Sequence, residues 1–521
     1  MGPTRTASNP IMTDVDQTRN PIFEPETEAN QKLRREVTPT DWANPEPAEK
    51  YNLVVIGAGS GGLVTAAGAA GLGAKVALIE RNALGGDCLN VGCVPSKALL
   101  AAAKRAAAVR DAGDYGVRGA EAAEVDFAAV MERMRELRAS IAPNDSAERF
   151  SEMGIDVFLG EGRFKDGSTI EVDGKELKFS KAVIATGGRA IVLPIPGLEE
   201  AGALTNETLF SLTELPKRLA VIGAGPIGCE MSQAFARLGS EVTLFEKECK
   251  ILQREDADAA KVVEAALERD GVQTVCDAEI EKVEREGALR VVRLQHKGET
   301  KRWEFDHILV GVGRAPNVEG IGLEAAGVQY DKRKGVEVDE RLQTSNKNIF
   351  AVGDVAMDYK FTHMADATAR IVIQNALFKG RKKYTDLIVP WCTYTQPELA
   401  HVGLYEDGAK ERYGDDVVSF KQDFAEVDRS ILEGHTEGFV KVHTVKGKIV
   451  GATIVGEHAG DLISEISVAM QSGMKLGALA AVIHPYPTTA EAIRKLGDSY
   501  NRTRFTPLVA KLFKTWLKWT R

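Results

Sequence analysis

A glycine-rich turn that occurs twice constrains the fold of this chain more than any other feature. Both copies have the pattern G-x-G-x-x-G, follow a short apolar run and precede a stretch rich in small residues, which predicts a strand, a tight turn and a helix. The six glycines are Gly57, Gly59 and Gly62 in the first copy and Gly223, Gly225 and Gly228 in the second. Another apolar run follows each helix, so each copy predicts a βαβ unit, and the chain is expected to have an α/β fold.

Each turn is suited to hold the pyrophosphate of a dinucleotide. The first glycine permits the tight turn, the second lets backbone N–H groups approach phosphate, and the third lets helix and strand pack closely. Glu80 follows Gly62 by 18 positions and Glu246 follows Gly228 by 18, where a carboxylate can accept hydrogen bonds from ribose hydroxyls. One such turn is a weak signal, but two copies in the same context predict two dinucleotide-binding units. Glu246 favours NAD(H) because an acid repels a 2′-phosphate, while Lys247 leaves NADP(H) open.

Composition excludes several classes of protein. The chain has 521 residues, enough for three or four domains, and 44% hydrophobic with 27% charged residues is typical of a globular protein. The formal net charge of −9 argues against nucleic acid as a main partner. No apolar run is long enough to span a membrane, and the N-terminus lacks the apolar core of a signal peptide, so we expect a cytoplasmic protein.

Cys88 and Cys93 lie five positions apart within the segment GGDCLNVGCVPSKALL, residues 85–100. In a reducing compartment, a close cysteine pair is more often catalytic or metal-binding than structural. The spacing alone leaves open a chance pair, half of a zinc site or two buried thiols. A zinc site needs further Cys or His ligands at short spacing, and none lies near, so we predict no resident metal. The other cysteines are Cys229, Cys249, Cys276 and Cys392, and we interpret them as small buried apolar residues.

The residues around the two cysteines resemble the active-site motif of the flavin-dependent pyridine nucleotide-disulfide oxidoreductases. The Val-Pro-Ser-Lys ending is similar to the dihydrolipoamide dehydrogenase and mercuric reductase branch of that family. The resemblance covers residues 51–498 and includes four further motifs. These are ATGG at 185–188, VGVGRAPN at 310–317, TSNKNIFAVGDV at 344–355 and WCTYTQPELAHVG at 391–403. The resemblance implies an enzyme that contains FAD and takes electrons from NAD(P)H.

The same resemblance implies a domain organisation. Two Rossmann-like dinucleotide-binding domains, for FAD and NAD(P), would precede a C-terminal α/β dimerisation domain, and the protein would be a homodimer. The expected segments are an N-terminal extension (1–50), the first part of the FAD domain (51–195), the NAD(P) domain (196–318), the second part of the FAD domain (319–388), the dimerisation domain (389–499) and a basic amphipathic tail (500–521). Residues 1–50 are polar without sustained periodicity, which predicts a mostly extended or disordered arm.

The resemblance also implies roles for individual residues. Cys93 would be the thiol next to the flavin and Cys88 the outer thiol that meets the substrate. A thiolate beside an oxidised flavin is favoured, so we expect a lowered Cys93 pKa. Lys97 would lie near the flavin and pair with Glu230. The remaining cofactor contacts are expected from the glycines of both turns and from Glu80, Gly162, Thr186, Gly187, Glu246, Gly313, Asp354 and His363.

One segment near the C-terminus, HPYPTTAE at 484–491, departs from the dihydrolipoamide dehydrogenase pattern. Those enzymes have at the position of Tyr486 a histidine that acts across the dimer as acid and base for thiol protons. A tyrosine has a pKa near 10 against about 6.5 for histidine, so it is a poor base at neutral pH. Glu491, the orienting acid, is retained, and His484 could substitute only if the loop shifts.

Mercuric reductases also have a tyrosine at this position, which favours that branch. They carry a C-terminal Cys-Cys pair as well, and no cysteine follows Cys392 here. The leading hypothesis is a mercuric reductase-like enzyme whose electron acceptor is a metal ion, a disulfide or another small molecule. The alternatives are a dihydrolipoamide dehydrogenase and a redox-sensing or membrane-docked flavoprotein with little turnover.

Residues 500–521 are basic and aromatic and contain no acidic side chain. On a helical wheel one side carries Leu508, Val509, Leu512, Phe513, Trp516 and Trp519, and the other carries Lys511, Lys514, Lys518 and Arg521. A basic amphipathic helix suits an anionic membrane surface, so peripheral contact of residues 502–521 with the inner face of the membrane is one hypothesis. The other is a helix packed on its own dimer with a solvated lysine stripe.

Overall fold

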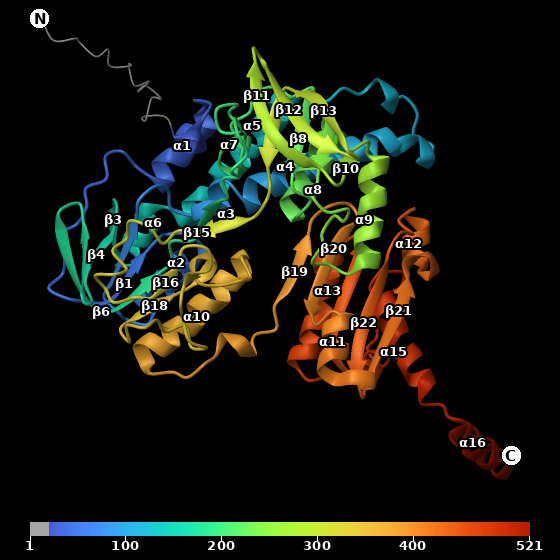
Figure 1. The fold of residues 1–521 in the computed structure, drawn as a ribbon. Helices are drawn as coiled ribbons and strands as arrows, with labels where there is room; N and C mark the ends of the chain where they lie inside the picture. Colours follow the sequence, from blue (N-terminus) through green and yellow to red (C-terminus); the bar gives the residue numbers. More distant parts are fainter. Residues whose placement is uncertain (1–19) are drawn as a thin grey trace, which may run out of the picture.

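The computed structural model describes residues 20–521 and has a mixed α/β architecture (Figure 1). The first domain is built on a seven-stranded sheet. Its strands run in the order β3 (Asp156–Leu159), β2 (Val76–Glu80), β1 (Tyr51–Ile56), β6 (Lys175–Ile184), β5 (Thr169–Val172) and β4 (Arg163–Asp166), and β18 (Ile349–Ala351) also pairs with β6. The core strands are parallel and their apolar runs are buried, as expected for a sheet covered on both faces.

Two helices from distant parts of the chain pack together in this domain. They are α2 (Ser60–Gly71), which follows the first glycine turn, and α10 (Thr362–Phe378). A Cβ at Gly68 would lie 2.6 Å from Ile373 Cδ1, so the small residues of α2 permit the close approach of α10. This contact brings residues near 60 and near 362 to the same edge of the sheet.

The second domain has a parallel sheet in the order β10 (Gln273–Val275), β9 (Glu241–Phe245), β8 (Arg218–Ile222) and β14 (His307–Val310). Helix α8 (Pro226–Leu238) follows the second glycine turn, and α9 (Ala257–Arg269) follows β9. An antiparallel sheet of β11 (Glu279–Glu286), β12 (Leu289–His296) and β13 (Glu299–Phe305) packs against it. A ladder between β7 (Gly188–Ala190) and β15 (Arg314–Pro316) joins the two domains where the chain leaves and re-enters the first.

A set of helices connects the cysteine segment to both domains. The set consists of α3 (Gly86–Asn90), α4 (Cys93–Arg110), α5 (Phe127–Ile141) and α6 (Ala147–Glu152). Helix α4 packs against α5 and against α8 of the second domain, and Leu99 and Ala103 are buried there. The helix that begins at Cys93 therefore packs against the second nucleotide-binding domain.

The prediction of an extended or disordered arm is wrong for residues 21–37, whereas residues 38–50 form no helix or strand. A 3-10 turn, Pro21–Phe23, and helix α1 (Glu28–Val37) pack on the first domain, and Leu33 is fully buried. Arg138, also buried, donates to Ile22 O at 2.9 Å and to Asn30 Oδ1 at 2.7 Å, which ties this segment to α5. Residues 1–19 of the predicted arm lie outside the described part of the chain.

The C-terminal domain is a five-stranded antiparallel sheet with helices against it. The strand order is β19 (Pro390–Thr393), β20 (Glu398–Gly403), β23 (Lys448–Gly456), β22 (Phe439–Val445) and β21 (Val417–Asp423), and its main helices are α13 (Ala459–Gln471) and α15 (Glu491–Thr503). The predicted tail forms helix α16 (Pro507–Trp519), which projects from the body of the chain (Figure 1) and has no buried residue. Among residues 20–521, no helix is long and apolar enough to cross a membrane.

Candidate active site

One cavity of about 1690 Å³ connects the two glycine turns with the cysteine pair. The predicted site residues that line it are Gly57, Gly59, Glu80, Cys88, Cys93, Lys97, Gly162, Thr186, Gly187, Gly223, Gly225, Glu230, Glu246, Gly313, Asp354 and His363. Gly62 and Gly228 lie behind this surface, between helix and strand. Tyr486 and Glu491 are elsewhere, in the C-terminal domain. Residues that are far apart in the sequence thus share one site.

The first glycine turn has no room for side chains where the backbone is tight. Gly57 has φ +101°, and a Cβ there would lie 2.3 Å from Ala185 O. A Cβ at Gly62 would lie 1.7 Å from Gly57 O. At Gly59 the nearest atom would be Gly86 Cα at 3.7 Å, so the space above the second glycine is open. The turn therefore fits a pyrophosphate that approaches the backbone at Gly59.

The second glycine turn repeats this geometry. Gly223 has φ +99°, and a Cβ at Gly228 would lie 1.9 Å from Gly223 O. A Cβ at Gly225 would have only Gly311 O, at 4.0 Å, as a neighbour. Both turns end at the start of a helix, whose N-terminus favours negative charge. The residues present thus fit two dinucleotides, one at each end of the cavity.

Each turn is braced by its own acid. Glu80 Oε2 accepts a hydrogen bond from Ala58 N at 2.7 Å, and Glu246 Oε2 accepts one from Ala224 N at 2.8 Å. Burial raises the pKa of Glu80, although hydrogen bonds from the backbone of Ala58, Asn82 and Arg81 oppose that shift. The sequence predicts only a ribose contact for these acids. The structure adds that each carboxylate fixes the amide between the first two glycines.

The cysteine pair lies where two helices begin. Cys93 is the first residue of α4, and its Sγ lies 3.3 Å from Oγ1 of Thr362, the first residue of α10. The hydrogen bond from Cys88 lowers the pKa of Cys93 to about 6, aided by Thr362 and by the charge of Lys97. The same hydrogen bond, together with burial, raises the pKa of Cys88. The negative charge is therefore held on Cys93 and the proton on Cys88, in the direction that the sequence predicts.

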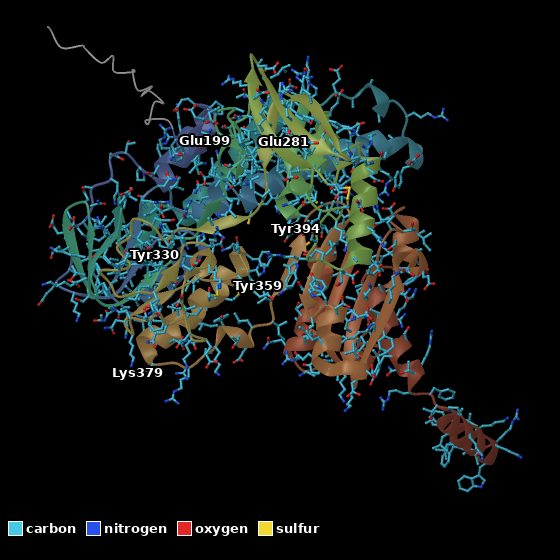
Figure 2. All side chains as sticks on the ribbon, viewed as in Figure 1. Glu199, Glu281, Tyr330, Tyr359, Lys379 and Tyr394 are labelled. Atoms are coloured by element: carbon cyan, nitrogen blue, oxygen red, sulfur yellow. A yellow bond between two sulfur atoms is a disulfide. The ribbon has the colours of Figure 1, made fainter. Side chains whose placement is uncertain are left out.

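Lys97 and Glu230 form an ion pair at the junction of the three domains. Lys97 Nζ lies 2.8 Å from Glu230 Oε2, and Glu230 is only 4% exposed. Glu230 Oε1 accepts a hydrogen bond from Tyr394 N at 2.8 Å, and Lys97 Nζ lies 4.6 Å from the centre of the Tyr394 ring. Tyr394 comes from the C-terminal domain (Figure 2). The pair is thus built into the site and is not a pair of solvated surface charges.

Asp354 and Thr186 are held by residues that the sequence analysis did not single out. Arg314 pairs with Asp87 of α3 and lies 3.3 Å from Asp354 Oδ2. Burial raises the pKa of Asp354, and the charge of Arg314 opposes this. Thr186 Oγ1 donates to Asn317 O at 2.7 Å. Arg314 and Asn317 both belong to the VGVGRAPN segment, so that motif could have identified them as site residues.

His363 lies at the cavity wall beside the cysteine pair. Its Nε2 is 2.7 Å from Pro390 O, and its ring stacks on Phe361 with centroids 5.2 Å apart. The neighbouring Thr362, not His363, makes the contact with Cys93. The sequence analysis missed Thr362 because a single threonine at a helix start has no distinctive pattern.

Tyr486 and Glu491 do not meet the cysteine pair within one chain. The Tyr486 hydroxyl donates to Asp428 Oδ2 at 2.7 Å, and the side chain is 71% exposed. Glu491 Oε1 accepts from Arg494 Nη2 at 3.0 Å. His484 has both ring nitrogens engaged, with Nε2 2.9 Å from Glu465 Oε1 and Nδ1 3.0 Å from Val482 O.

The prediction that the four other cysteines are buried apolar residues is wrong for Cys249 and Cys276. These two form a disulfide, and Cys249 is exposed. Cys229 is fully buried as predicted, and Cys392 is half-buried. The two bonded cysteines follow β9 and β10, which are neighbours only once the sheet has formed. Sequence separation therefore concealed the pair.

Comparisons with known proteins identify the family of this chain. Residues 51–369 match the family described as pyridine nucleotide-disulphide oxidoreductase, and residues 389–496 match the dimerisation domain of that family. The chain is 37% identical over 456 residues to a mercuric reductase of Lysinibacillus sphaericus, covering 87% of this chain and 83% of the relative. It is 35% identical over 455 residues to a dihydrolipoyl dehydrogenase of Geobacillus stearothermophilus, covering 85% and 95%.

A solved structure has the same fold. The HOCl-induced flavoprotein disulfide reductase RclA from Escherichia coli superposes with a TM-score of 0.77 at 29% identity, covering 86% of this chain and 99% of that one. A Cu(II) complex of the same protein gives a TM-score of 0.77 at 28% identity, covering 87% and 99%.

The fold and the site thus define a flavoprotein with two dinucleotide-binding domains and a redox-active cysteine pair. The chain belongs to the pyridine nucleotide-disulphide oxidoreductase family. The expected fold class is confirmed, and so is the class of enzyme, an oxidoreductase that uses FAD and NAD(P)H. The dimerisation domain supports a homodimer.

Proposed function

We propose that this enzyme passes electrons from NAD(P)H to the Cys88–Cys93 pair and from there to a thiophilic metal ion. Residues 51–195 and 319–388 would hold FAD, residues 196–318 NAD(P)H, and residues 389–499 the partner subunit. Bound FAD supplies the two-electron relay between the nicotinamide and the cysteine pair. The observation that carries the proposal is one cavity that joins both glycine turns to two thiols, with Cys93 Sγ 3.3 Å from Thr362 Oγ1 and the Lys97–Glu230 ion pair lining the same cavity. The lowered pKa of Cys93 is consistent with this arrangement.

The residues around the pair have separate tasks in this proposal. Thr362 and Lys97 stabilise the Cys93 thiolate, and Glu230 fixes Lys97. Cys88 keeps its proton until a substrate arrives and is the thiol that meets it. A soft metal ion prefers thiolate ligands, so an ion that reaches Cys88 can displace that proton and bind both sulfurs.

A metal acceptor is favoured over lipoamide because Tyr486 occupies the position at which the dihydrolipoamide dehydrogenases have their histidine base. Oxidation of a dithiol needs a group that accepts thiol protons, and a positioned base contributes about 10²–10⁴-fold. The hydrogen bond to Asp428 raises the pKa of Tyr486 above its usual range, so its phenol stays protonated at neutral pH. The relatives named mercuric reductase and the Cu(II) complex of RclA also favour a metal ion as the acceptor.

Dihydrolipoamide oxidation is the second candidate, and a specific observation favours it. Glu491 is retained in the C-terminal domain, with one carboxylate oxygen buried and without a partner among residues 20–521. Such an oxygen can accept a hydrogen bond from an imidazole at a nearby position. Dihydrolipoamide oxidation therefore requires a basic side chain close to Glu491.

The experiment that separates the candidates is steady-state oxidation of NADH with three acceptors at matched FAD content: Hg(II) bound to a small thiol, Cu(II), and lipoamide. We expect kcat/KM for one of the metals to exceed that for lipoamide. Cys88→Ser and Cys93→Ser should each remove the metal-dependent turnover. Faster turnover of lipoamide than of either metal would contradict the proposal.

A substitution tests the missing base directly. Tyr486→His should raise dihydrolipoamide oxidation at least about tenfold, since an imidazole restores a base beside its orienting acid. Tyr486→Phe is the matched control, and it should give no increase because it also lacks a base. Brisk activity of the unmodified enzyme, or no gain in the histidine variant, would show that Tyr486 is not the block.

We also propose that α16 lies on an anionic membrane surface. Its apolar side chains are 55–77% exposed at Leu508, Leu512, Phe513, Trp516, Leu517 and Trp519. The basic residues complement anionic lipid. Sedimentation with phosphatidylglycerol-containing vesicles should retain the full chain and not a truncation after Asn501. If the full chain and the truncated chain sedimented equally with the vesicles, α16 would not bind the membrane and would instead pack on the partner subunit.

A further inference from the structure

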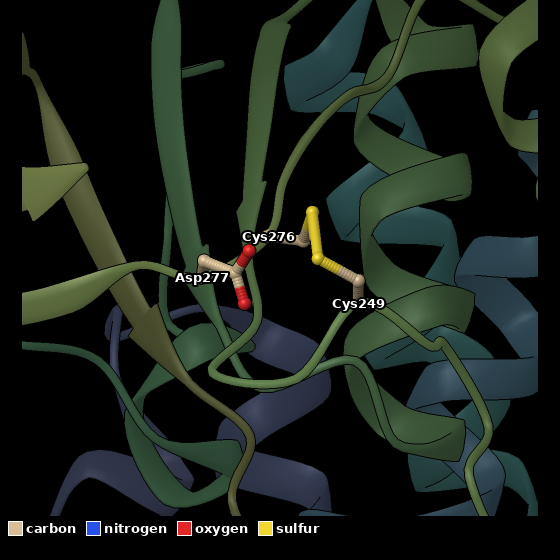
Figure 3. A group of neighbouring side chains, drawn as sticks. All are labelled: Cys249, Cys276 and Asp277. Atoms are coloured by element: carbon tan, nitrogen blue, oxygen red, sulfur yellow. A yellow bond between two sulfur atoms is a disulfide. The ribbon is translucent and has the colours of Figure 1, made fainter. Parts of the chain in front are cut away.

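The disulfide between Cys249 and Cys276 lies beside the second glycine turn and outside the cavity. The two Cα atoms are 4.7 Å apart, and 27 positions separate the residues in sequence. Figure 3 shows the pair next to Asp277, whose carboxylate lies within 4.8 Å of both sulfur atoms. Cys249 is exposed and Cys276 is half-buried, so the bond can be reached from solution.

One side of the disulfide is attached to the segment that pairs with the backbone of Glu246. Glu246 N donates to Val275 O at 3.0 Å, and Ala278 N donates to Glu246 O at 3.3 Å. Cys276 lies between these two partners. The position of the β10 end is therefore coupled to the backbone of the acid that braces the nucleotide turn.

The other side is attached to the loop that wraps the Glu246 side chain. Glu246 Oε1 accepts hydrogen bonds from Lys247 N at 2.8 Å, from Glu248 N at 3.2 Å and from Gln253 Nε2 at 3.3 Å. Cys249 comes directly after Glu248. Without the disulfide, Cys249 itself would be held only through the exposed hydrogen bonds of its neighbours to Glu246, which are weak constraints in water. The far end of the loop stays anchored by the buried Ile251 and Leu252.

Both segments form the wall of the cavity at its second nucleotide end. Glu246, Lys247 and Gln253 line it from the loop, and Ala278 lines it from the segment after β10. The disulfide joins the two segments across Glu246. A constraint of this kind preorganises a binding surface and lowers the cost of ordering it when a ligand binds.

We propose that Cys249 and Cys276 are a second thiol–disulfide site, separate from Cys88 and Cys93, whose redox state sets the affinity of the second glycine turn for NAD(P)H. The inference rests on the proposed nucleotide role of that turn. The reductant is a dithiol in solution. Its thiolate attacks the disulfide, the bond between Cys249 and Cys276 breaks, and a disulfide forms within the reagent. Two electrons pass to the protein, and the two protons of the dithiol end on the Sγ atoms of Cys249 and Cys276.

The test compares the FAD-loaded enzyme with the variants Cys249→Ser, Cys276→Ser and the double variant. We expect each to raise KM for NADH about fivefold, the scale of ordering one loop side chain on binding, with kcat within about twofold. All three should agree, because the crosslink needs both sulfurs. Treatment with dithiothreitol should give the unmodified enzyme the same KM and should leave the double variant unchanged.

A second readout monitors the pair without any turnover. Differential alkylation and mass spectrometry should show Cys249 and Cys276 becoming labelled together as dithiothreitol is increased. Complete labelling with an unchanged KM, or single variants whose effects differ and add, would overturn the inference. Absence of NADH turnover in every form, the unmodified enzyme included, would count against the proposed function instead, since the labelling result would still stand.

Discussion

The first glycine turn, at Gly57, and the second, at Gly223, share a backbone shape and a bracing acid but differ in the segment that comes after the next strand. After β2 the chain continues into α3, and Gly85 N donates to Ala58 O at 2.9 Å, which holds the cysteine segment against the turn. A Cβ at Gly86 would lie 2.6 Å from Gly59 Cα, so only glycine permits this approach. After β9 the chain forms a loop closed by the disulfide of Cys249.

This difference explains how one motif serves two tasks in one chain. The glycine pattern supplies a place for a pyrophosphate, and the segment after the second strand supplies the chemistry. At the first turn that segment brings two thiols to the cavity, while at the second it brings cavity wall and a disulfide that lies outside the cavity. We therefore expect electron transfer through thiols facing the cavity at the first turn, and only nucleotide binding at the second.

The largest expected effect comes from filling the space behind each turn. A Cβ at Gly62 would collide with Gly57 O, so Gly62→Ala should lower bound FAD per protein at least about tenfold, a severe defect of local packing. Gly228→Ala should keep FAD and instead raise KM for NADH. Gly71→Ala in the same helix α2 is the control, because a Cβ there has no neighbour within 4 Å. Flavin absorbance measures bound FAD, and circular dichroism checks that each variant is folded. Equal loss of FAD in Gly62→Ala and Gly228→Ala would contradict the assignment of separate roles to the two turns.

A smaller effect is expected from the two acids. Glu246 should make kcat/KM for NADH about tenfold higher than for NADPH, a difference of about 1.4 kcal/mol, because a carboxylate repels the 2′-phosphate. Glu246→Gln should narrow that preference. Glu80→Gln at the first turn should leave the ratio unchanged, which makes it a matched control. A higher kcat/KM with NADPH in the unmodified enzyme would contradict the assignment of Glu246.

The smallest effect concerns the ion pair beside the cysteines. The charge of Lys97 lowers the pKa of Cys93 and the charge of Glu230 raises it. Lys97→Met should therefore move the Cys93 titration to higher pH, and Glu230→Gln should move it to lower pH, each by about one unit or less. Thiolate absorbance as a function of pH measures both shifts. If both substitutions shifted the pKa of Cys93 in the same direction, the two charges would not act on Cys93 independently.

Much of the site can be predicted from sequence because its parts are local. Each glycine turn lies within six residues, and the two thiols lie within another six, so spacing carries the geometry. The pairing of Lys97 with Glu230 is not local, and only the resemblance to a known family indicates it. Thr362 depends on how distant segments meet, and no pattern around it marks its role. Arg314 lies within the VGVGRAPN motif, but its pairing with Asp87 and Asp354 again depends on how distant segments meet.

The N-terminal helix and the second cysteine pair show two different limits. Helix α1 has a weak signal, since Ala29, Leu33 and Val37 recur every four residues after the capping Thr27, but its polar composition hides that stripe. The Cys249–Cys276 bond has no signal along the chain, because it depends on β10 lying beside β9. Periodicity can reveal the first kind of feature, whereas the second needs the assembled sheet.

The division of one proton between Cys88 and Cys93 is tested most directly by the long-wavelength absorption of the FAD-loaded Cys88→Ser variant. Contact between a thiolate and oxidised flavin produces such a band. In Cys88→Ser a serine hydroxyl replaces the thiol that donates to Cys93, and Thr362 and Lys97 remain, so the pKa of Cys93 should stay below its usual value. The band should therefore be visible at neutral pH and disappear when the pH is lowered. Cys93→Ser should lack the band at every pH. No band in Cys88→Ser at neutral pH, or a band in Cys93→Ser, would contradict the assignment of Cys93 as the thiolate next to the flavin.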